Sequence, residues 1–300
     1  MDYKKFIRSQ KLRFLILKFL GFVPDAQMVK MQYRIKMGRR LNLKSPRRMS
    51  EWIQWYKVNY RNPLMNRCVD KYEVRKYVED CGLASILNHL HGVYEHASEI
   101  DFSKLPERFI IKTTSGSGGE NVVICKNKSQ LDIPAVRMSL DNWLSLKTTN
   151  AGREWAYSGI SVPRIIVEDL LEQPENPKDG LTDYKIFCFN GEPKFIITDK
   201  SRYTHHRRNI FTTDWKDLRV SCEYGMADKV ERPKNLDGML DIARKLSAAF
   251  PFVRVDLYNL DGKIYFGELT FYPWSGYMTF EPDDFDFKSG EMFSHVSFDN

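Results

Sequence analysis

The chain is poor in cysteine, and its cysteines are not arranged in pairs. Its 300 residues include 5 cysteines, an odd number, and no two of them form a Cys-x-x-Cys motif. This spacing argues against a structural zinc site and against a disulfide framework, and it fits a reducing compartment. We therefore expect a cytoplasmic protein.

Long apolar runs and targeting signals are also scarce. The most apolar N-terminal stretch, residues 14–23, is interrupted by Lys18 and is not followed by a small-residue cleavage site. It is also far shorter than the roughly 20 residues that span a bilayer. Basic residues flank it, so we expect an amphipathic helix that either packs on the body of the protein or lies on the inner face of the membrane.

The glycine-rich segment of the chain lacks the features of two common nucleotide-binding motifs. Residues 114–121 read Thr-Ser-Gly-Ser-Gly-Gly-Glu-Asn and stand between two predicted strands, residues 108–113 and 122–126. A P-loop requires a lysine after the glycines and then a helix, and a Rossmann fingerprint also requires a helix. The pattern predicts instead a strand–loop–strand flap over Lys112, whose backbone N–H groups can surround phosphates. An ordinary hairpin is the alternative.

Negative charge is scarce in the first quarter of the chain. Residues 1–77 contain 20 Lys and Arg against 5 Asp and Glu, whereas the remaining residues contain 26 against 34. The basic segment therefore either binds an anionic surface or polymer, or pairs with the acidic remainder. The aromatic residues from Trp52 to Tyr56 follow helical spacing, which is more typical of a core than of a nucleic-acid stacking platform, and we expect no nucleic-acid partner.

A predicted β-hairpin near the C-terminus carries polar side chains on one face. Residues 252–258 and 264–271 are rich in β-branched and aromatic side chains, and the segment from Asn259 to Gly262 has turn composition. A three-residue loop would place Asn259 opposite Lys263. Side chains alternate along each strand, so one face would then be apolar. The expected core face is Val253, Val255, Leu257, Tyr265, Leu269 and Phe271.

The same register brings charged groups together on the other face. Arg254 would lie directly across from Glu268, Asp256 one diagonal step away, and Thr270 beside them. Two carboxylates this close repel each other unless a cation lies between them, and Mg²⁺ prefers such oxygen ligands. A structural salt-bridge network is the alternative reading of the same residues.

A second hairpin is predicted upstream, at residues 183–198. Asn190-Gly191 between two strand-like segments favours a type I′ turn. In the matching register, Asp183 and Lys185 share a face with Lys194 and Thr198.

In chain order, the sequence combines Lys112, the glycine loop, a strand ending near Glu168, Asp183-x-Lys185, Arg254-x-Asp256 and Glu268-x-Thr270. This order resembles the ATP-grasp superfamily, α+β proteins in which two lobes enclose ATP under a glycine flap. The surrounding segments, among them Ile111-Lys-Thr-Thr-Ser-Gly-Ser-Gly-Gly119 and Phe266-Gly-Glu-Leu-Thr-Phe271, are similar to the TupA-like ATP-grasp group. Members of that group are associated with teichuronopeptide and capsular-polysaccharide gene clusters of bacteria.

The resemblance implies three regions and a set of site residues. The regions are a basic helical segment (1–68), a pre-grasp and glycine-flap lobe (69–165), and a C-terminal lobe with the magnesium-binding hairpin (166–300). Catalysis would depend on Arg254, which stabilises charge on the transferring phosphoryl group, and on the phosphate-binding Lys185. The implied ATP contacts are Lys112, Ser115, Gly116, Ser117, Gly118, Gly119, Glu168, Asp169, Leu171 and Asp183.

The implied metal ligands are Asp256, Glu268 and Thr270. ATP-grasp enzymes usually have Asn where this chain has Thr270, and a hydroxyl is a weaker ligand than an amide oxygen. The resemblance therefore implies ATP and Mg²⁺ as cofactors but leaves open whether one or two Mg²⁺ ions bind.

The implied activity is an ATP- and Mg²⁺-dependent carboxylate–amine ligase that acts through an acyl phosphate and releases ADP. Its expected substrates are the uronic acid carboxylate of an anionic surface saccharide and an amino acid or other amine. A nucleotide-sugar glycosyltransferase, a sugar kinase using the same ATP site, and a non-catalytic module that binds anionic polymer or membrane are the alternatives.

Overall fold

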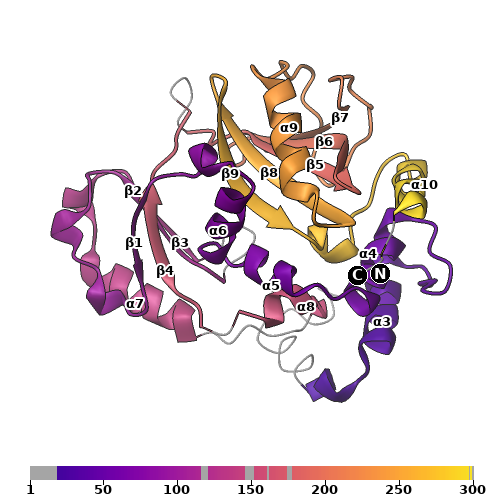
Figure 1. The fold of residues 1–300 in the computed structure, drawn as a ribbon, viewed down its shortest axis with the longest axis horizontal. Coiled ribbons are helices and arrows are strands. Elements are labelled where there is room, and N and C mark those ends of the chain that lie inside the picture. The colour runs from indigo at the N-terminus through magenta and orange to yellow at the C-terminus, as the bar shows by residue number, and fades with distance from the viewer. Residues whose placement is uncertain are drawn as a thin grey trace.

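The computed structural model describes residues 19–115, 121–145, 152–160, 162–173, 178–296 and 298. Two antiparallel sheets stand side by side in this part of the chain, each with helices packed against it (Figure 1). Their strand orders are β1-β4-β2-β3 and β7-β6-β5-β8-β9. The predicted α+β class is confirmed.

The four-stranded sheet carries the glycine flap. Its strands are β1 (Leu90–Tyr94), β2 (Phe109–Thr113), β3 (Val122–Cys125) and β4 (Ile165–Asp169), and helix α7 (Ile133–Ser145) packs on one face around Phe109, Ile111 and Leu140. Lys112 on β2 pairs with Val122 on β3, so the flap joins two neighbouring antiparallel strands, as predicted. The central glycines, Gly116 to Gly119, lie outside the described residues.

The five-stranded sheet is the larger one. Its strands are β5 (Asp183–Phe189), β6 (Glu192–Lys200), β7 (Arg207–Thr212), β8 (Phe252–Leu260) and β9 (Lys263–Thr270). Apolar residues recur every three or four positions along α9 (Leu236–Ser247), so one side of this helix is buried against β5, β6 and β8. Val253, Val255 and Leu257 contribute to the same core, and the opposite side chains of β8 are free to form a polar face.

Helices precede the sheets and join them. They are α3 (Asp25–Met37), α4 (Met49–Asn59), α5 (Pro63–Val69) and α6 (Glu73–Asp80), with the short α8 (Trp155–Ser158) beside α5. Asp70 accepts hydrogen bonds from the backbone N–H groups of Tyr72 and Glu73, which satisfies two donors at the start of α6. Near the end of the described chain, α10 (Asp284–Glu291) packs on α4. None of the helices in the described ranges has the length and apolarity to cross a bilayer.

The register of the C-terminal hairpin differs from the prediction. Asp261 and Gly262 both have positive φ and form a two-residue turn, so Asn259 pairs with Ile264 rather than with Lys263. A bulge at Gly267 then shifts the pairing by one residue.

The shifted register changes which side chains face each other. Asp256 lies directly across from Glu268, and Arg254 lies across from Thr270. Tyr265 pairs with Tyr258 on the polar face, so its assignment to the core was wrong. Ile264 and Phe266 lie on the core face instead. Arg254, Asp256, Glu268 and Thr270 still share one face, as predicted. The extra residue in the bulge compensates for the shorter turn and returns Glu268 and Thr270 to that face.

The upstream hairpin has the predicted turn but a different register. Asn190 and Gly191 both adopt positive φ, as a type I′ turn requires. A bulge near Lys194 then pairs Asp183 with Asp199 and Lys185 with Ile197. Thr198 is thereby placed on the opposite face, and the predicted grouping of Lys185 with Lys194 and Thr198 was wrong.

Candidate active site

Three oxygen atoms from two strands converge on one nitrogen of Arg254. Its Nη2 donates to Asp256 Oδ2 at 2.6 Å, to Glu268 Oε1 at 3.0 Å and to Thr270 Oγ1 at 3.0 Å. Nε donates to the other oxygen of Asp256 at 2.6 Å. These bonds use Nε and Nη2, and no hydrogen bond joins Nη1 to another described residue, so Nη1 can contact an anionic ligand.

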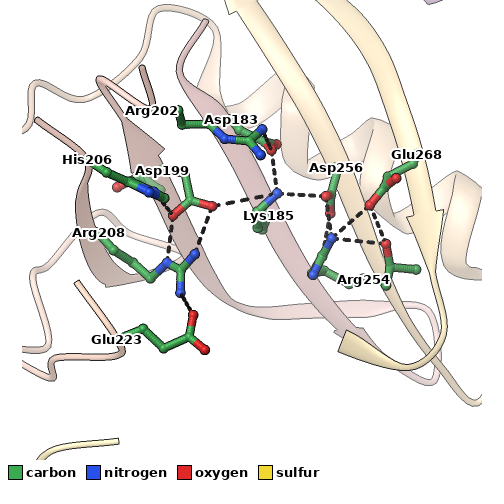
Figure 2. Close-up of polar contacts among 12 residues, drawn as sticks. Asp183, Lys185, Asp199, Arg202, His206, Arg208, Glu223, Arg254, Asp256 and Glu268 are labelled. Atoms are coloured by element: carbon green, nitrogen blue, oxygen red, sulfur yellow. Dashed lines mark hydrogen bonds and ion pairs between the residues drawn. The ribbon is translucent and has the colours of Figure 1, made fainter. Parts of the chain in front are cut away.

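Lys185 continues the charged face onto β5. Its ammonium donates to Asp256 Oδ2 at 2.9 Å and to Asp183, and Asp199 lies 3.9 Å away (Figure 2). Asp183 also accepts from Arg202 at 3.3 Å, while its Oδ1 is buried without a hydrogen-bond partner among the described residues. An unsatisfied buried carboxylate oxygen favours an additional donor or cation at this point.

The structure adds residues that the sequence reasoning missed. Asp199 is 2% exposed and accepts from Arg208 Nε at 2.6 Å and from His206 Nε2 at 3.0 Å. Arg208 also donates to Glu223 at 2.8 Å. Residues 199–209 are rich in charged and polar side chains in the sequence, but the bulge that pairs Asp199 with Asp183 is what brings this segment to Lys185.

Burial and ion pairing determine the charge state of this cluster. Burial alone would lower the pKa of Lys185, but Asp183 and Asp256 hold that pKa above its ordinary value. Burial alone would raise the pKa of Glu268 and of Asp199. Arg254 and Lys185 instead lower the pKa of Glu268 to about 2, and Arg208 lowers the pKa of Asp199 to about 2. The lysine and both carboxylates are therefore charged at neutral pH.

A second charged group lies on the four-stranded sheet. Lys112 forms an ion pair with Glu168 at 2.7 Å, and Glu168 also pairs with Arg75 of α6 at 2.9 Å. These two residues, both predicted to contact ATP, lie on the neighbouring strands β2 and β4, and Glu168 is 6% exposed. Lys112, which was predicted to bind phosphate, is therefore paired with Glu168 in this structure.

The other predicted ATP contacts are less closely grouped. Asp169 lies at the end of β4 and bonds His91 Nε2 at 2.7 Å, and Leu171 follows it, partly buried. Ser115 lies in the turn after β2. Gly116, Ser117, Gly118 and Gly119 lie outside the described residues, so their contacts stay a prediction.

Lys71 links the two charged groups and was also missed. Its backbone N–H donates to Thr114 O at the base of the flap, at 3.2 Å. Burial lowers the pKa of its side chain to about 8, although Glu268 on one sheet and Glu168 on the other oppose the shift. Lys71 and Glu268 also line one small pocket. The segment before α6 therefore contributes a cation between the sheets.

The oxygens around Arg254 Nη2 suit a hard cation. Mg²⁺ commonly takes one or two protein carboxylates and completes its shell with water and phosphate oxygens. Asp256, Glu268 and Thr270 already surround a single positively charged atom. Among the described residues no group of three His, Cys, Asp or Glu side chains could hold a metal alone, so a Mg²⁺ ion here would need further oxygens from a ligand.

Two antiparallel sheets, a glycine-rich segment between two paired strands and charged residues on both sheets are the features expected of an ATP-grasp protein. The sequence model of the family described as TupA-like ATPgrasp matches residues 51–294. The chain belongs to this family, as its motifs predicted.

Solved structures of ligases match this chain at low sequence identity. D-alanine–D-alanine ligase from Helicobacter pylori is 16% identical, with 77% of this chain and 61% of that chain covered and a TM-score of 0.42. The Bacillus anthracis enzyme complexed with ATP is 14% identical, with 77% and 66% covered and a TM-score of 0.45. The ATP-grasp ligase PsnB, complexed with a minimal precursor, is 11% identical, with 84% and 67% covered and a TM-score of 0.39.

The chain spans 61% of the length of the Helicobacter pylori ligase. The search of curated proteins found no match. The family assignment therefore rests on the match to the family's sequence model.

Proposed function

We propose that this protein is an ATP- and Mg²⁺-dependent carboxylate–amine ligase that works through an acyl phosphate. The carboxylate substrate takes the γ-phosphoryl group and ADP is released. The amine then attacks the acyl carbon, phosphate leaves, and the ammonium protons pass to solvent. The observation that carries the proposal is the convergence of Asp256, Glu268 and Thr270 on Arg254 Nη2, with Lys185 beside them.

Each group has a task in this reaction. Phosphoryl transfer depends on positioning and charge neutralisation more than on a covalent residue. Lys112 and the flap amides bind the phosphates from one sheet, and Lys185 binds them from the other. Nη1 of Arg254 stabilises charge on the transferring group and the acyl phosphate. A Mg²⁺ ion held by Asp256, Glu268 and Thr270 would supply charge neutralisation at the β- and γ-phosphates.

The proposed substrates are a uronic acid carboxylate of a bacterial surface saccharide and an amino acid or similar amine. The family resemblance supports this choice, and the basic residues around the site suit an anionic acceptor. We place the protein in the cytoplasm, with the basic N-terminal segment in peripheral contact with the membrane or with the polysaccharide-assembly machinery.

Product identification tests the reaction. Purified protein with ATP, Mg²⁺, uronic acids and a mixture of amino acids is expected to release ADP and phosphate and to form an amide detectable by mass spectrometry. Asp256→Asn is expected to lower ADP release about 100-fold or more, because it removes charge where the phosphates bind. Asp261→Asn, in the turn of the same hairpin, is the matched control and keeps wild-type turnover.

Other products would contradict the proposed ligase reaction. AMP and pyrophosphate would exclude an acyl phosphate mechanism, and a phosphorylated sugar without amide would identify a kinase. Binding of UDP-sugars in preference to ATP would identify a glycosyltransferase. Equal activity of Asp256→Asn and wild type would remove the metal assignment.

A further inference from the structure

Two consecutive residues after β9 have an unusual backbone conformation. Trp274 has φ 47° and ψ 27°, and Ser275 has φ 57° and ψ 20°. This left-handed region is disfavoured for residues with a Cβ, because the side chain approaches the backbone. Such conformations persist only where surrounding contacts hold them, and they concentrate at functional sites.

Helix α4 supplies the contacts that hold this segment. Lys57 donates to the backbone oxygen and to the hydroxyl of Ser275, both at 2.7 Å. Gln54 donates to Ser275 O at 2.9 Å and to Gly276 O at 3.2 Å. Lys57 and Gln54 are both 0% exposed. The bonds fix the backbone of the segment and, with it, the position of the Trp274 side chain.

The indole of Trp274 lies against two site arginines. The guanidinium carbon of Arg254 is 4.9 Å from the ring centroid, and that of Arg208 is 4.7 Å from it. The ring is also parallel to that of Phe187, with an interplanar angle of 6° and centroids 6.4 Å apart. Contacts of this length between a guanidinium and an indole face are attractive.

We propose that Trp274 is a positioning residue that holds Arg254, and through Arg208 also Asp199, in the orientation that phosphoryl transfer requires. This inference rests on the proposed function. Within the described part of the chain, the side-chain hydrogen bonds of Arg254 go to Asp256, Glu268 and Thr270, the same residues that are proposed to hold Mg²⁺. If these oxygens bind a metal, they can no longer hold Arg254 as they do here. The contact with the indole of Trp274 does not involve these oxygens and can still hold the guanidinium.

Turnover of three variants tests the proposal. Trp274→Leu removes the aromatic face, and Trp274→Phe keeps one. Trp215→Leu is the matched control, because Trp215 is also partly buried and stacks on Phe211 at 4.2 Å, on β7. Trp274→Leu is expected to lower kcat for ADP release about tenfold, equivalent to about 1.4 kcal/mol in the barrier, with KM for ATP changed less than about twofold.

The other two variants separate positioning from packing. Trp274→Phe is expected to keep kcat within about threefold of wild type, because phenylalanine also presents a π face to a guanidinium. Trp215→Leu is expected to leave kcat unchanged even where it lowers the melting temperature. Wild-type kcat in Trp274→Leu, or an equal loss in Trp274→Phe or Trp215→Leu, would overturn the proposal.

A second measurement does not depend on turnover. In the full chain labelled with ¹⁵N-arginine, the Nε–H signal of Arg254 is identified by its loss in Arg254→Lys. Because an aromatic ring shifts nearby resonances, Trp274→Leu is expected to move this signal, and Trp215→Leu is expected to leave it in place. An unmoved signal in Trp274→Leu overturns the positioning role, whatever the activity. A moved signal without ligase turnover in wild type would reject the ligase and keep the positioning role.

Discussion

At the scale of single residues, the number of oxygens around one nitrogen of Arg254 supports the proposed metal site. A surface ion pair joins two groups, whereas Arg254 Nη2 contacts Asp256, Glu268 and Thr270 together. Arg254 and Asp256 are 5% and 2% exposed. Burying a charged set at this depth is costly unless every charge is compensated, and an ATP site gives a reason to keep such a set.

Thr270 tests how much the hydroxyl contributes to metal binding. It accepts from Arg254 Nη2 at 3.0 Å and donates to Glu268 at 2.8 Å. Thr270→Val keeps the shape and removes the oxygen, so we expect the Mg²⁺ concentration for half-maximal ADP release to rise about tenfold. Thr198→Val, a buried threonine on the opposite face of the same sheet, is the control. An unchanged Mg²⁺ requirement in Thr270→Val would remove Thr270 from the metal site.

Buried Lys57 makes the free energy of unfolding depend on pH. Burial lowers its pKa from 10.5 to about 8, against the opposing charge of Glu154. Between these two values the unfolded chain binds more protons than the folded chain, so the contribution of Lys57 to stability increases as pH rises.

We therefore expect the stability of wild type relative to Lys57→Met to increase by about 1–2 kcal/mol between pH 7.5 and 9.5. Urea unfolding of both proteins across this range measures the difference. A difference that stays constant with pH would show that Lys57 keeps an ordinary pKa in the folded protein.

At the scale of elements, two β-bulges build the site. The bulge at Gly267 places Glu268 opposite Asp256, and the bulge near Lys194 places Asp199 opposite Asp183. Each bulge adds one residue to one strand and so changes which side chains are neighbours. Without the first bulge, the two proposed metal ligands would not face each other.

Gly267 is required for the first of these bulges. A Cβ at this position would lie 2.8 Å from the backbone oxygen of Asp256, so the two strands would have to separate. We expect Gly267→Ala to lower stability by about 1–3 kcal/mol and to lower ADP release more than about tenfold, because Glu268 moves relative to Asp256.

The control for this substitution is Gly21→Ala, where a Cβ would meet nothing within 4 Å. Urea unfolding and ADP release measure both variants. A Gly267→Ala protein with wild-type turnover would show that the site does not depend on the bulge.

At the scale of the whole molecule, ion pairs join α6 to the four-stranded sheet. Arg75 pairs with Glu168 on β4 at 2.9 Å and donates to Asn88 O at 2.8 Å. Arg164, before β4, pairs with Glu73 of the same helix at 2.6 Å. The segment between α5 and α6 also carries Lys71. Arg75 of the basic segment thus pairs with Glu168 of the acidic remainder.

Arg75→Met tests this connection. Glu168 would lose one of its two cations and bind Lys112 more strongly, leaving less positive charge for phosphates. We expect the Kd of Mg²⁺-ATP, measured by calorimetry, to rise about three- to tenfold. Lys76→Met, on the exposed side of α6 where Lys76 pairs with Asp80, is the control. An equal Kd in wild type and Arg75→Met would show that Glu168 does not modulate Lys112.

The sequence by itself determined the order of the elements, the flap between two strands, the polar face of the C-terminal hairpin and the family. Strand periodicity, turn composition and motif order are local properties, and they identify Arg254, Asp256, Glu268 and Thr270 without coordinates. Only the tertiary structure decided which of these residues face each other. Register depends on turn length and on bulges, and a shift of one residue moves every side chain to the other face.

The same reason explains the residues that sequence reasoning missed. Asp199, Lys71 and Trp274 are close to the motifs in the chain but are not among their predicted site residues. They reach the site through the pairing of β5 with β6, the hydrogen bond of Lys71 to Thr114 and the hydrogen bonds of α4 to Ser275. Long-range packing of this kind has no signature in a single sequence, because it depends on how separate elements meet.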